Sequence, residues 1–375
     1  MSGTPAPAAT STVSFARGAP STDIVDVEGL RDAAVAAFTN DPAGVTGYGT
    51  AIGYVPLRRW IAEKHGVPED HVLVTNGSMQ ADAFFFDELV DPGTVVVTER
   101  PTYDRTLLGL RERGADVRLV TLEVDGIAVD EVAELLGTGA RPAFAHVIPN
   151  FQNPAGYTLS LAKREQLLGL AKEHGFLVFE DDPYVDIRFS GEPLPRMLEL
   201  DGGPASTSVV YACSFSKTVC PGIRVGYLVG PPELIDRIRV RATNTYIAPG
   251  MVAQATVYEY LRGPRFPAAL ERVKTALGER VDLLCSALTE HLPQAVFARP
   301  DGGYFLWVSL PEGEGHDGRR IAAEAASRGV AIVPGSDFLL DGGENSFRLA
   351  YSAVQPGQID DGVRRLAEAV AAARG

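Results

Sequence analysis

The chain has 375 residues, 45% of them hydrophobic, which is enough for a large core and favours two domains over one. Its formal net charge is -14, so neither nucleic acid nor an anionic membrane is expected as the main partner. No stretch is long and apolar enough to span a bilayer.

The first residues have neither the basic start nor the apolar run of a secretory signal. Residues 1–13 are therefore predicted to be a disordered leader. The three cysteines, Cys213, Cys220 and Cys285, lack metal-ligand spacing and suit a reducing compartment. We expect a cytoplasmic protein without a metal site.

Residues 14–45 are predicted to form an N-terminal arm that belongs partly to a small domain. The arm begins with the segment VSFARGAP, which stops at Pro20, and a helix with apolar residues at helical spacing follows over 29–38.

Residues 46–265 are predicted to form the large domain. Short apolar, β-branched runs near residues 71–75, 94–99, 176–180 and 208–214 alternate with amphipathic helices. This alternation favours a mostly parallel sheet that helices cover on both faces, an α/β fold.

Residues 266–375 show a different order of predicted helices and strands. A long amphipathic helix over 267–292 precedes candidate strands within 296–310, 331–338 and 345–353, and a helix over 358–373 closes the chain. This order predicts a second, smaller α+β domain.

Polar residues follow several strands of the predicted sheet, where ligands bind in open α/β folds. Gly77 and Ser78 lie between a strand and a helix, a pattern that cradles phosphate in some proteins but is common in others. Asp181 and Asp182 end another strand, and Asn153 stands before a proline. Helix caps and turns explain these residues equally well at this point.

Lys217 lies in the stretch SFSKTVCPGIRVGY, between apolar strands. A buried, charged lysine is costly, and both desolvation and a nearby cation such as Arg224 lower its pKa. A neutral amine is a nucleophile that forms a Schiff base with a carbonyl cofactor. Arg348, in the segment FRLAYS, is predicted to point inward and to need an anion, either a structural carboxylate or a ligand.

Together these residues resemble the fold-type-I pyridoxal-phosphate-dependent class I/II aminotransferases, and most of all the 2-aminoadipate/kynurenine transaminase-like branch. The resemblance runs from about Ser14 to the C-terminus. Its specificity lies in eight motifs in a fixed order. These motifs are YGTAIGYVPLR, TNGSMQ, RPTYD, PNFQNPAG, EDDPY, SFSKTVCPGIRVGY, GGYFLW and FRLAYS.

The resemblance implies a role for each matching residue around pyridoxal 5'-phosphate. Lys217 is expected to form the Schiff base and to move a proton between the substrate Cα and the cofactor C4′. Asp181 would keep the pyridine nitrogen protonated. Asn153 and Tyr184 would bind the ring oxygen, and Tyr103 would stack on the ring. The expected catalytic residues are Lys217, Asp181 and Tyr184.

The cofactor phosphate would be held by hydroxyls, a backbone amide and a guanidinium. These donors are Ser78, Met79, Ser214, Ser216 and Arg224. The Met79 side chain cannot contribute, and relatives often have glutamine there. Tyr48 would reach the phosphate of the partner subunit in a homodimer.

Substrate recognition is assigned to Arg348, which would clamp the α-carboxylate together with Asn153. Arg17 stands where relatives often have glycine. We expect it to bind a distal carboxylate of the substrate, and the competing interpretation is a surface or inter-subunit ion pair.

The implied reaction is a ping-pong transfer of an amino group from an amino acid to a 2-oxo acid, 2-oxoglutarate being the expected acceptor. Two alternatives stay open. The same fold also supports elimination, cyclisation or oxidation of amino acids. The second alternative is an aminotransferase-like effector module of a transcription regulator. The short N-terminal arm and the acidic net charge disfavour it. The sequence does not rank the amino donors.

Overall fold

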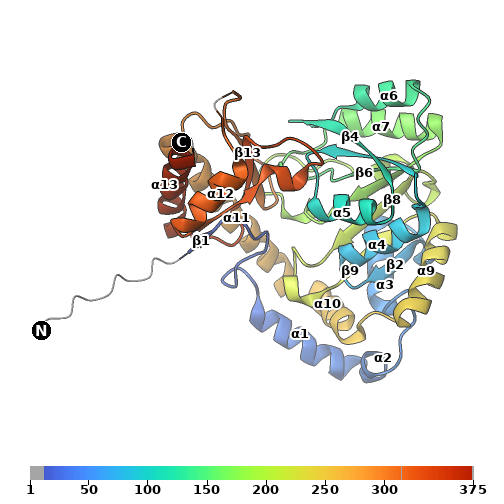
Figure 1. Cartoon of the computed structure of the whole chain (residues 1–375). Helices are drawn as coiled ribbons and strands as arrows, with labels where there is room; N and C mark the ends of the chain where they lie inside the picture. The colour runs from blue at the N-terminus through green and yellow to red at the C-terminus, as the bar shows by residue number, and fades with distance from the viewer. Residues whose placement is uncertain (1–11, 314, 374–375) are drawn as a thin grey trace, which may run out of the picture.

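The computed structural model describes residues 12–313 and 315–373. Its larger part is built on an eight-stranded sheet (Figure 1). In spatial order the strands are β2 (Val72–Thr75), β9 (Gly226–Val229), β8 (Val209–Ser214), β7 (Leu177–Asp181), β6 (Phe144–Val147), β3 (Val95–Arg100), β4 (Asp116–Glu123) and β5 (Gly126–Ile127). Neighbours from β8 to β4 pair in parallel, whereas β9 and β5 are antiparallel to their neighbours.

Helices cover both faces of this sheet, because alternate residues of the buried strands point to opposite sides. In β2, Leu73 belongs to the core on one face, while Val72 and Val74 belong to the core on the other. One face is covered by α4 (Ser78–Leu89), α5 (Asp104–Glu112) and α9 (Pro232–Tyr246). The other is covered by α3 (Val55–His65), α6 (Val129–Gly137), α7 (Leu161–His174), α8 (Met197–Leu200) and α10 (Met251–Arg262).

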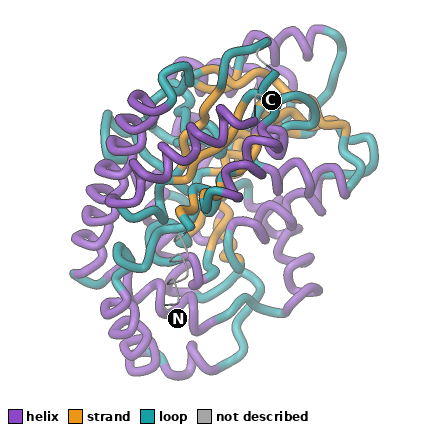
Figure 2. The backbone as a smooth tube through the Cα atoms, turned by 60° about the vertical axis from the view of Figure 1, so that its left-hand side comes forward, coloured by secondary structure: helices purple, strands orange, loops and turns teal. Residues whose placement is uncertain are grey.

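The smaller part joins two short sheets to three helices. Strands β10 (Phe305–Ser309), β13 (Ser346–Ala350) and β12 (Val333–Pro334) form an antiparallel sheet, and β1 (Val13–Ser14) pairs in parallel with β11 (Val330–Ala331). Helices α11 (Arg265–His291), α12 (Gly318–Ser327) and α13 (Pro356–Ala373) pack around them. In Figure 2 the strands occupy the middle of the molecule and the helices lie around them. The predicted fold class, a large α/β unit with a small α+β unit, is confirmed.

The N-terminal arm is shared between the two parts. Val13, Phe15 and Ile24 pack in the core of the small part, whereas Ala33 and Val45 pack in the core of the large sheet. The latter two come from α1 (Val27–Asn40) and α2 (Pro42–Thr46), which lie against α10. We therefore propose that the division within residues 14–45 falls between Ile24 and Ala33.

The predicted leader overlaps the folded part at its last residue. Val13 was included in the disordered leader, but it is buried and pairs with Val330 in the β1–β11 sheet. Residues 1–11 of the leader lie outside the described residues. Among the described helices, including the 27 residues of α11, none has the length and apolar composition to cross a membrane.

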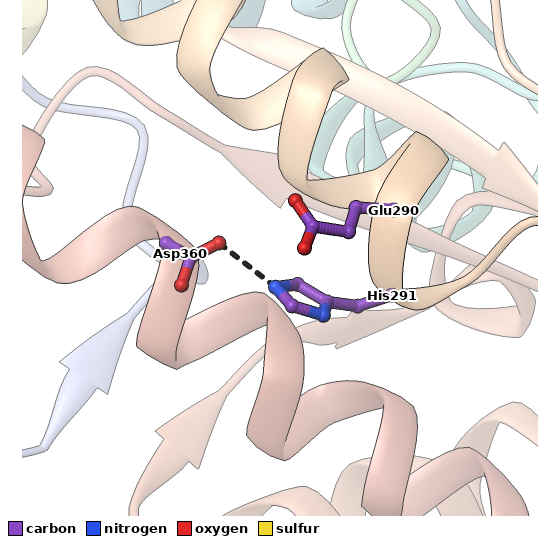
Figure 3. A group of neighbouring side chains, drawn as sticks. All are labelled: Glu290, His291 and Asp360. Carbon is purple, nitrogen blue, oxygen red and sulfur yellow. Dashed lines mark hydrogen bonds and ion pairs between the residues drawn. The ribbon is translucent and has the colours of Figure 1, made fainter.

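Helices α11 and α13 are also joined by polar contacts at the surface (Figure 3). His291 Nε2 lies 2.8 Å from Asp360 Oδ1, and one oxygen of Glu290 completes a group of three potential metal-ligand atoms within 4.8 Å of one another. Both carboxylates are exposed, and the His291–Asp360 hydrogen bond accounts for the arrangement as a link between helices.

Candidate active site

A cavity of about 140 Å³ opens at the carboxyl ends of the parallel strands. It is enclosed by residues from α4, β7, β8 and the loops that follow β3, β6 and β8. Its lining consists of Ser78, Met79, Asp82, Tyr103, Ile148, Asn153, Asp181, Pro183, Tyr184, Ser214, Ser216, Lys217 and Arg224. Ten of these were expected from the sequence, so residues separated by up to 146 positions meet in one cavity.

Lys217 differs from the other lysines of the chain. The chain has five lysines, and the other four, Lys64, Lys163, Lys172 and Lys274, each pair with a carboxylate. Lys217 Nζ instead lies 5.5 Å from the ring centre of Tyr184 and 5.4 Å from that of Tyr304. Burial, together with the positive charge of Arg224, lowers the pKa of Lys217 to about 8. About half of its amine is therefore neutral at pH 8.

Asp181 ends β7 inside the cavity. It is buried, and its Oδ1 has no hydrogen-bond partner. Burial and the adjacent Asp182 together raise the pKa of Asp181 to about 7, against the opposing positive charge of Lys217. Buried polar atoms are normally satisfied, so an unpartnered carboxyl oxygen lining a cavity marks a place for a ligand donor.

The opposite end of the cavity carries hydroxyls and a guanidinium at the N-terminus of α4. Arg224 donates to Ser216 Oγ at 3.0 Å, and the Ser216 amide donates to Ser214 Oγ at 3.1 Å. Gly77 precedes Ser78 with φ 87°, and a Cβ atom at Gly77 would lie 2.2 Å from Arg224 Nη2. Only glycine therefore lets the guanidinium lie over the amides of the helix N-terminus, an arrangement that suits a phosphate group.

Arg348 lies on β13 beside the cavity, although it is not part of the lining. Its Nη1 donates to Asn153 Oδ1 at 2.8 Å, and its Nη2 donates to the Ala16 carbonyl at 2.8 Å. The guanidinium lies over the rings of Phe305 and Phe338, and its buried Nε has no partner. No carboxylate of the described residues pairs with Arg348. The structural ion pair considered from the sequence is therefore not formed within this part of the chain.

The N-terminal arm passes over this region. The carbonyl of Ala16 binds Arg348, and the carbonyl of Gly18 lies 3.5 Å from Lys217 Nζ. Arg17, between them, is exposed and makes no ion pair with a described residue. Its backbone is thus at the mouth of the cavity, beside both cations.

Tyr48 does not join the cavity of its own chain. Its side chain is 96% exposed, in the loop between α2 and α3. Among residues 12–313 and 315–373, no hydrogen-bond or ring-stacking partner explains this aromatic side chain in solvent.

Three residues beside the cavity were missed or undervalued. Asp82 lies one turn into α4, four residues after Ser78, and so faces the cavity; a charged residue among the apolar residues of a helix was the available signal. His146 has its Nε2 atom 3.9 Å from Asp181 Oδ2. Burial lowers the pKa of His146 to about 3, so it is a neutral neighbour and not an ion-pair partner. Tyr304 donates its hydroxyl to the Lys217 carbonyl at 3.1 Å.

Comparison with known proteins places this cavity in context. The model of the family described as "Aminotransferase class I and II" matches residues 11–366, nearly the whole chain. The chain belongs to the class I and II aminotransferase family. The family resemblance stated from the sequence is thereby confirmed.

Individual members of the family are similar along most of their length. A 2-aminoadipate transaminase from Thermus thermophilus is 34% identical, over 96% of this chain and 90% of the relative. The crystal structure of an alpha-aminoadipate aminotransferase from Thermus thermophilus, complexed with N-(5'-phosphopyridoxyl)-L-leucine, superposes with a TM-score of 0.91 at 33% identity, over 96% of this chain and 92% of the other. A Pyrococcus horikoshii kynurenine aminotransferase in complex with PMP also superposes with a TM-score of 0.91, at 31% identity over 97% and 91% of the two chains.

Proposed function

We propose that the protein is a pyridoxal-phosphate-dependent aminotransferase that moves an amino group from an amino acid to a 2-oxo acid. The observation that carries this proposal is the convergence of three groups that lack a partner of the complementary kind. Lys217 has no carboxylate partner, Asp181 has an unpartnered buried oxygen, and the buried cation Arg348 has no anion among the described residues. An amine, an acid and an anion receptor in one place fit an amino acid and a carbonyl cofactor.

The lining fits pyridoxal phosphate at both ends. Ser78, the Met79 amide, Ser214, Ser216 and Arg224 would hold the phosphate at the N-terminus of α4. At the other end, Asp181 would accept a hydrogen bond from the ring nitrogen. Tyr103 would cover the ring face, and Asn153 and Tyr184 would bind the ring oxygen. When bound, the cofactor supplies an aldehyde that condenses with amines and a ring that accepts the electrons of the substrate Cα–H bond.

Lys217 is assigned two tasks, to hold the cofactor between turnovers and to carry a proton during them. Its Nζ would take the proton from the substrate Cα and deliver it to the cofactor C4′. A lowered pKa favours both, because a protonated ammonium is neither a nucleophile nor a base. The Tyr304 hydroxyl, bonded to the Lys217 carbonyl, fixes the backbone from which the amine reaches.

The substrate carboxylate is assigned to Arg348. Its Nε is unpartnered, and Asn153 and the Ala16 carbonyl hold the remaining nitrogens, so the guanidinium is positioned before a carboxylate arrives. Arg17, an unpaired cation at the mouth, is proposed to bind a distal carboxylate. This favours 2-oxoglutarate as acceptor in a ping-pong cycle in which amino acid and oxo acid use the site in turn.

We further propose a homodimer in the cytoplasm. The 96% exposed Tyr48 would be placed against the phosphate of the partner subunit. Three cysteines without disulfides, Cys213, Cys220 and Cys285, agree with a reducing compartment.

A product assay tests the reaction type. Purified protein with pyridoxal phosphate is given a panel of amino acids, each with and without 2-oxoglutarate, and glutamate and the oxo acid are quantified. Equal amounts of the two products, formed only with the acceptor, support transamination. Continuous product formation without any acceptor would identify an elimination, cyclisation or oxidation instead.

A further inference from the structure

Asp82 is a buried acid that none of the preceding roles uses. It lies on α4, three residues after Met79 and four after Ser78, so helical spacing puts all three on the face that lines the cavity. Its side chain is 5% exposed, and its neighbours along the helix, Ala81 and Phe84, belong to the apolar core. Its Oδ1 has no hydrogen-bond partner.

Asp181 lines the same cavity from β7, and its Oδ1 is also unpartnered. The two carboxyl groups therefore share one enclosed space without a hydrogen-bond donor on either free oxygen. Two carboxylates in one buried site do not both ionise near neutral pH, because each disfavours the charge of the other and burial disfavours both.

The groups that face this pair supply little compensation for a second negative charge. His146 on β6 is neutral, and Tyr103 before α5 keeps its proton, its pKa being raised to about 12 by burial and by nearby carboxyls. Lys217 after β8 is the cation that acts on Asp181, and the adjacent buried acid Asp182 acts on it in the opposite direction. On α9, Arg237 and Arg241 instead pair with Glu88, at the far end of α4.

We propose that Asp82 and Asp181 share one proton, held on Asp82, so that the pair presents a single negative charge to the ring nitrogen of the cofactor. Asp82 is then a positioning residue, a neutral carboxylic acid that acts through Asp181. The direction of its pKa agrees, since burial and then Asp181 raise the pKa of Asp82 well above its ordinary value. This inference rests on the proposed function only where the cofactor is concerned.

The first test reads the proton directly. Infrared spectra of the full-length protein in heavy water are compared for wild type and Asp82→Asn, with and without pyridoxal phosphate. At pH 7, Asp82→Asn is expected to lose one carbonyl-stretching band of a protonated carboxyl group. Loss of carboxylate bands instead would show that Asp82 is ionised and would overturn the proposal.

Glu99→Gln provides the matched control. Glu99 is also buried, and burial raises its pKa to about 8, but its carboxylate accepts from Gln152 Nε2 at 2.9 Å. Its variant should remove a band of its own and leave the Asp82 band in place. If Asp82→Asn does not fold, wild type labelled with carbon-13 aspartate replaces it. A protonated aspartate band that persists well above pH 7, where Asp181 is ionised, then supports the proposal, and its absence overturns it.

The second test follows the ring. Protein is loaded with pyridoxal phosphate that carries nitrogen-15 in the ring, and the nitrogen resonance reports whether this atom is protonated. Asp82→Asn should keep the proton at pH 7, because Asp181 carries the single charge, while Asp181→Asn should lose it. Loss of the ring proton in Asp82→Asn would overturn the proposal. Failure to bind the cofactor at all would instead contradict the proposed function and leave the infrared result valid.

Discussion

The acidic and the cationic side of the site differ in how many partners their charged groups have. On the acidic side, Asp82 on α4 and Asp181 on β7 are buried acids, each with an oxygen that has no partner, and their pKa values are raised. On the other side the cations are supported. Arg224 is bonded to Ser216, and Arg348 to Asn153.

This difference indicates that the acidic side binds a hydrogen-bond donor of the ligand and that the cationic side binds its anionic groups. Unpartnered carboxyl oxygens need a donor, such as a protonated ring nitrogen, and arginines held by neutral acceptors remain free to bind a phosphate or a carboxylate. Lys217 lies between the two sides, and both act on its pKa: Arg224 and Arg348 lower it and Asp181 raises it.

The largest effect is expected from removing the amine between the two sides. Lys217→Ala should lower kcat by about 10⁴-fold, since both the covalent attachment and the proton carrier are lost. Lys274→Ala, which removes a lysine already paired with Glu271 outside the cavity, is the control and should keep wild-type kcat. Steady-state kinetics with saturating cofactor measures both, and near-wild-type turnover of Lys217→Ala would refute the assignment.

The acidic side is tested by Asp181→Asn. The amide cannot hold the ring nitrogen in its protonated form, so kcat should fall by about 10²- to 10³-fold while the cofactor phosphate still binds. Single-turnover rates and cofactor titration separate the two effects. An unchanged kcat would mean that another acid, Asp82 being the nearest candidate, carries the negative charge.

The cationic side is tested by Arg348→Lys, which keeps the charge and removes the planar fork. A lost charge-assisted hydrogen bond is worth about 1.5–3 kcal/mol, so kcat/KM for amino acids should fall roughly 10- to 100-fold. Binding of the cofactor alone should stay unchanged. If cofactor affinity falls instead and kcat/KM follows it, Arg348 serves the cofactor and not the substrate.

The lowered pKa of Lys217 predicts that the rate of cofactor attachment depends on pH. Its pKa is about 8, below the ordinary value, so the neutral amine becomes scarce below pH 8. The rate of cofactor attachment to cofactor-free protein should therefore rise about tenfold per pH unit below pH 8 and level off above it. Stopped-flow absorbance follows this rate. A plateau that begins only near pH 10 would show that the cavity does not lower the pKa of the lysine.

The smallest effect is expected at the mouth. Arg17 is exposed, and ion pairs of exposed charges contribute up to about 1 kcal/mol, so Arg17→Ala should raise KM for dicarboxylic substrates by up to about fivefold. KM for a monocarboxylic amino acid such as alanine is the internal control. An equal rise for both classes of substrate would remove the proposed contact.

The features that could be predicted from the sequence depend on local patterns. Apolar runs such as that of β8 identify buried strands, and the residue types around Lys217 and Arg224 identify a nucleophile beside an anion site. Because parallel strands end at the same edge of the sheet, residues that follow different strands were expected together, and the cavity contains ten of them.

The features that could not be predicted depend on contacts between distant segments. The carbonyls of Ala16 and Gly18 meet Arg348 and Lys217 only after the arm crosses the molecule, and backbone acceptors leave no signature in side-chain composition. Asp82 was missed because a single acid on a helix resembles a solvated residue until burial is known. The role proposed for Tyr48 requires a second subunit, which one sequence does not place.

The most direct test of the central claim is to fix the cofactor where it is held. The protein loaded with pyridoxal phosphate is reduced with borohydride, digested, and its peptides are mapped by mass spectrometry. The account predicts a phosphopyridoxyl group on Lys217 and on none of the other four lysines. A modification at another lysine, or no modification in a protein that has bound the cofactor, would contradict it.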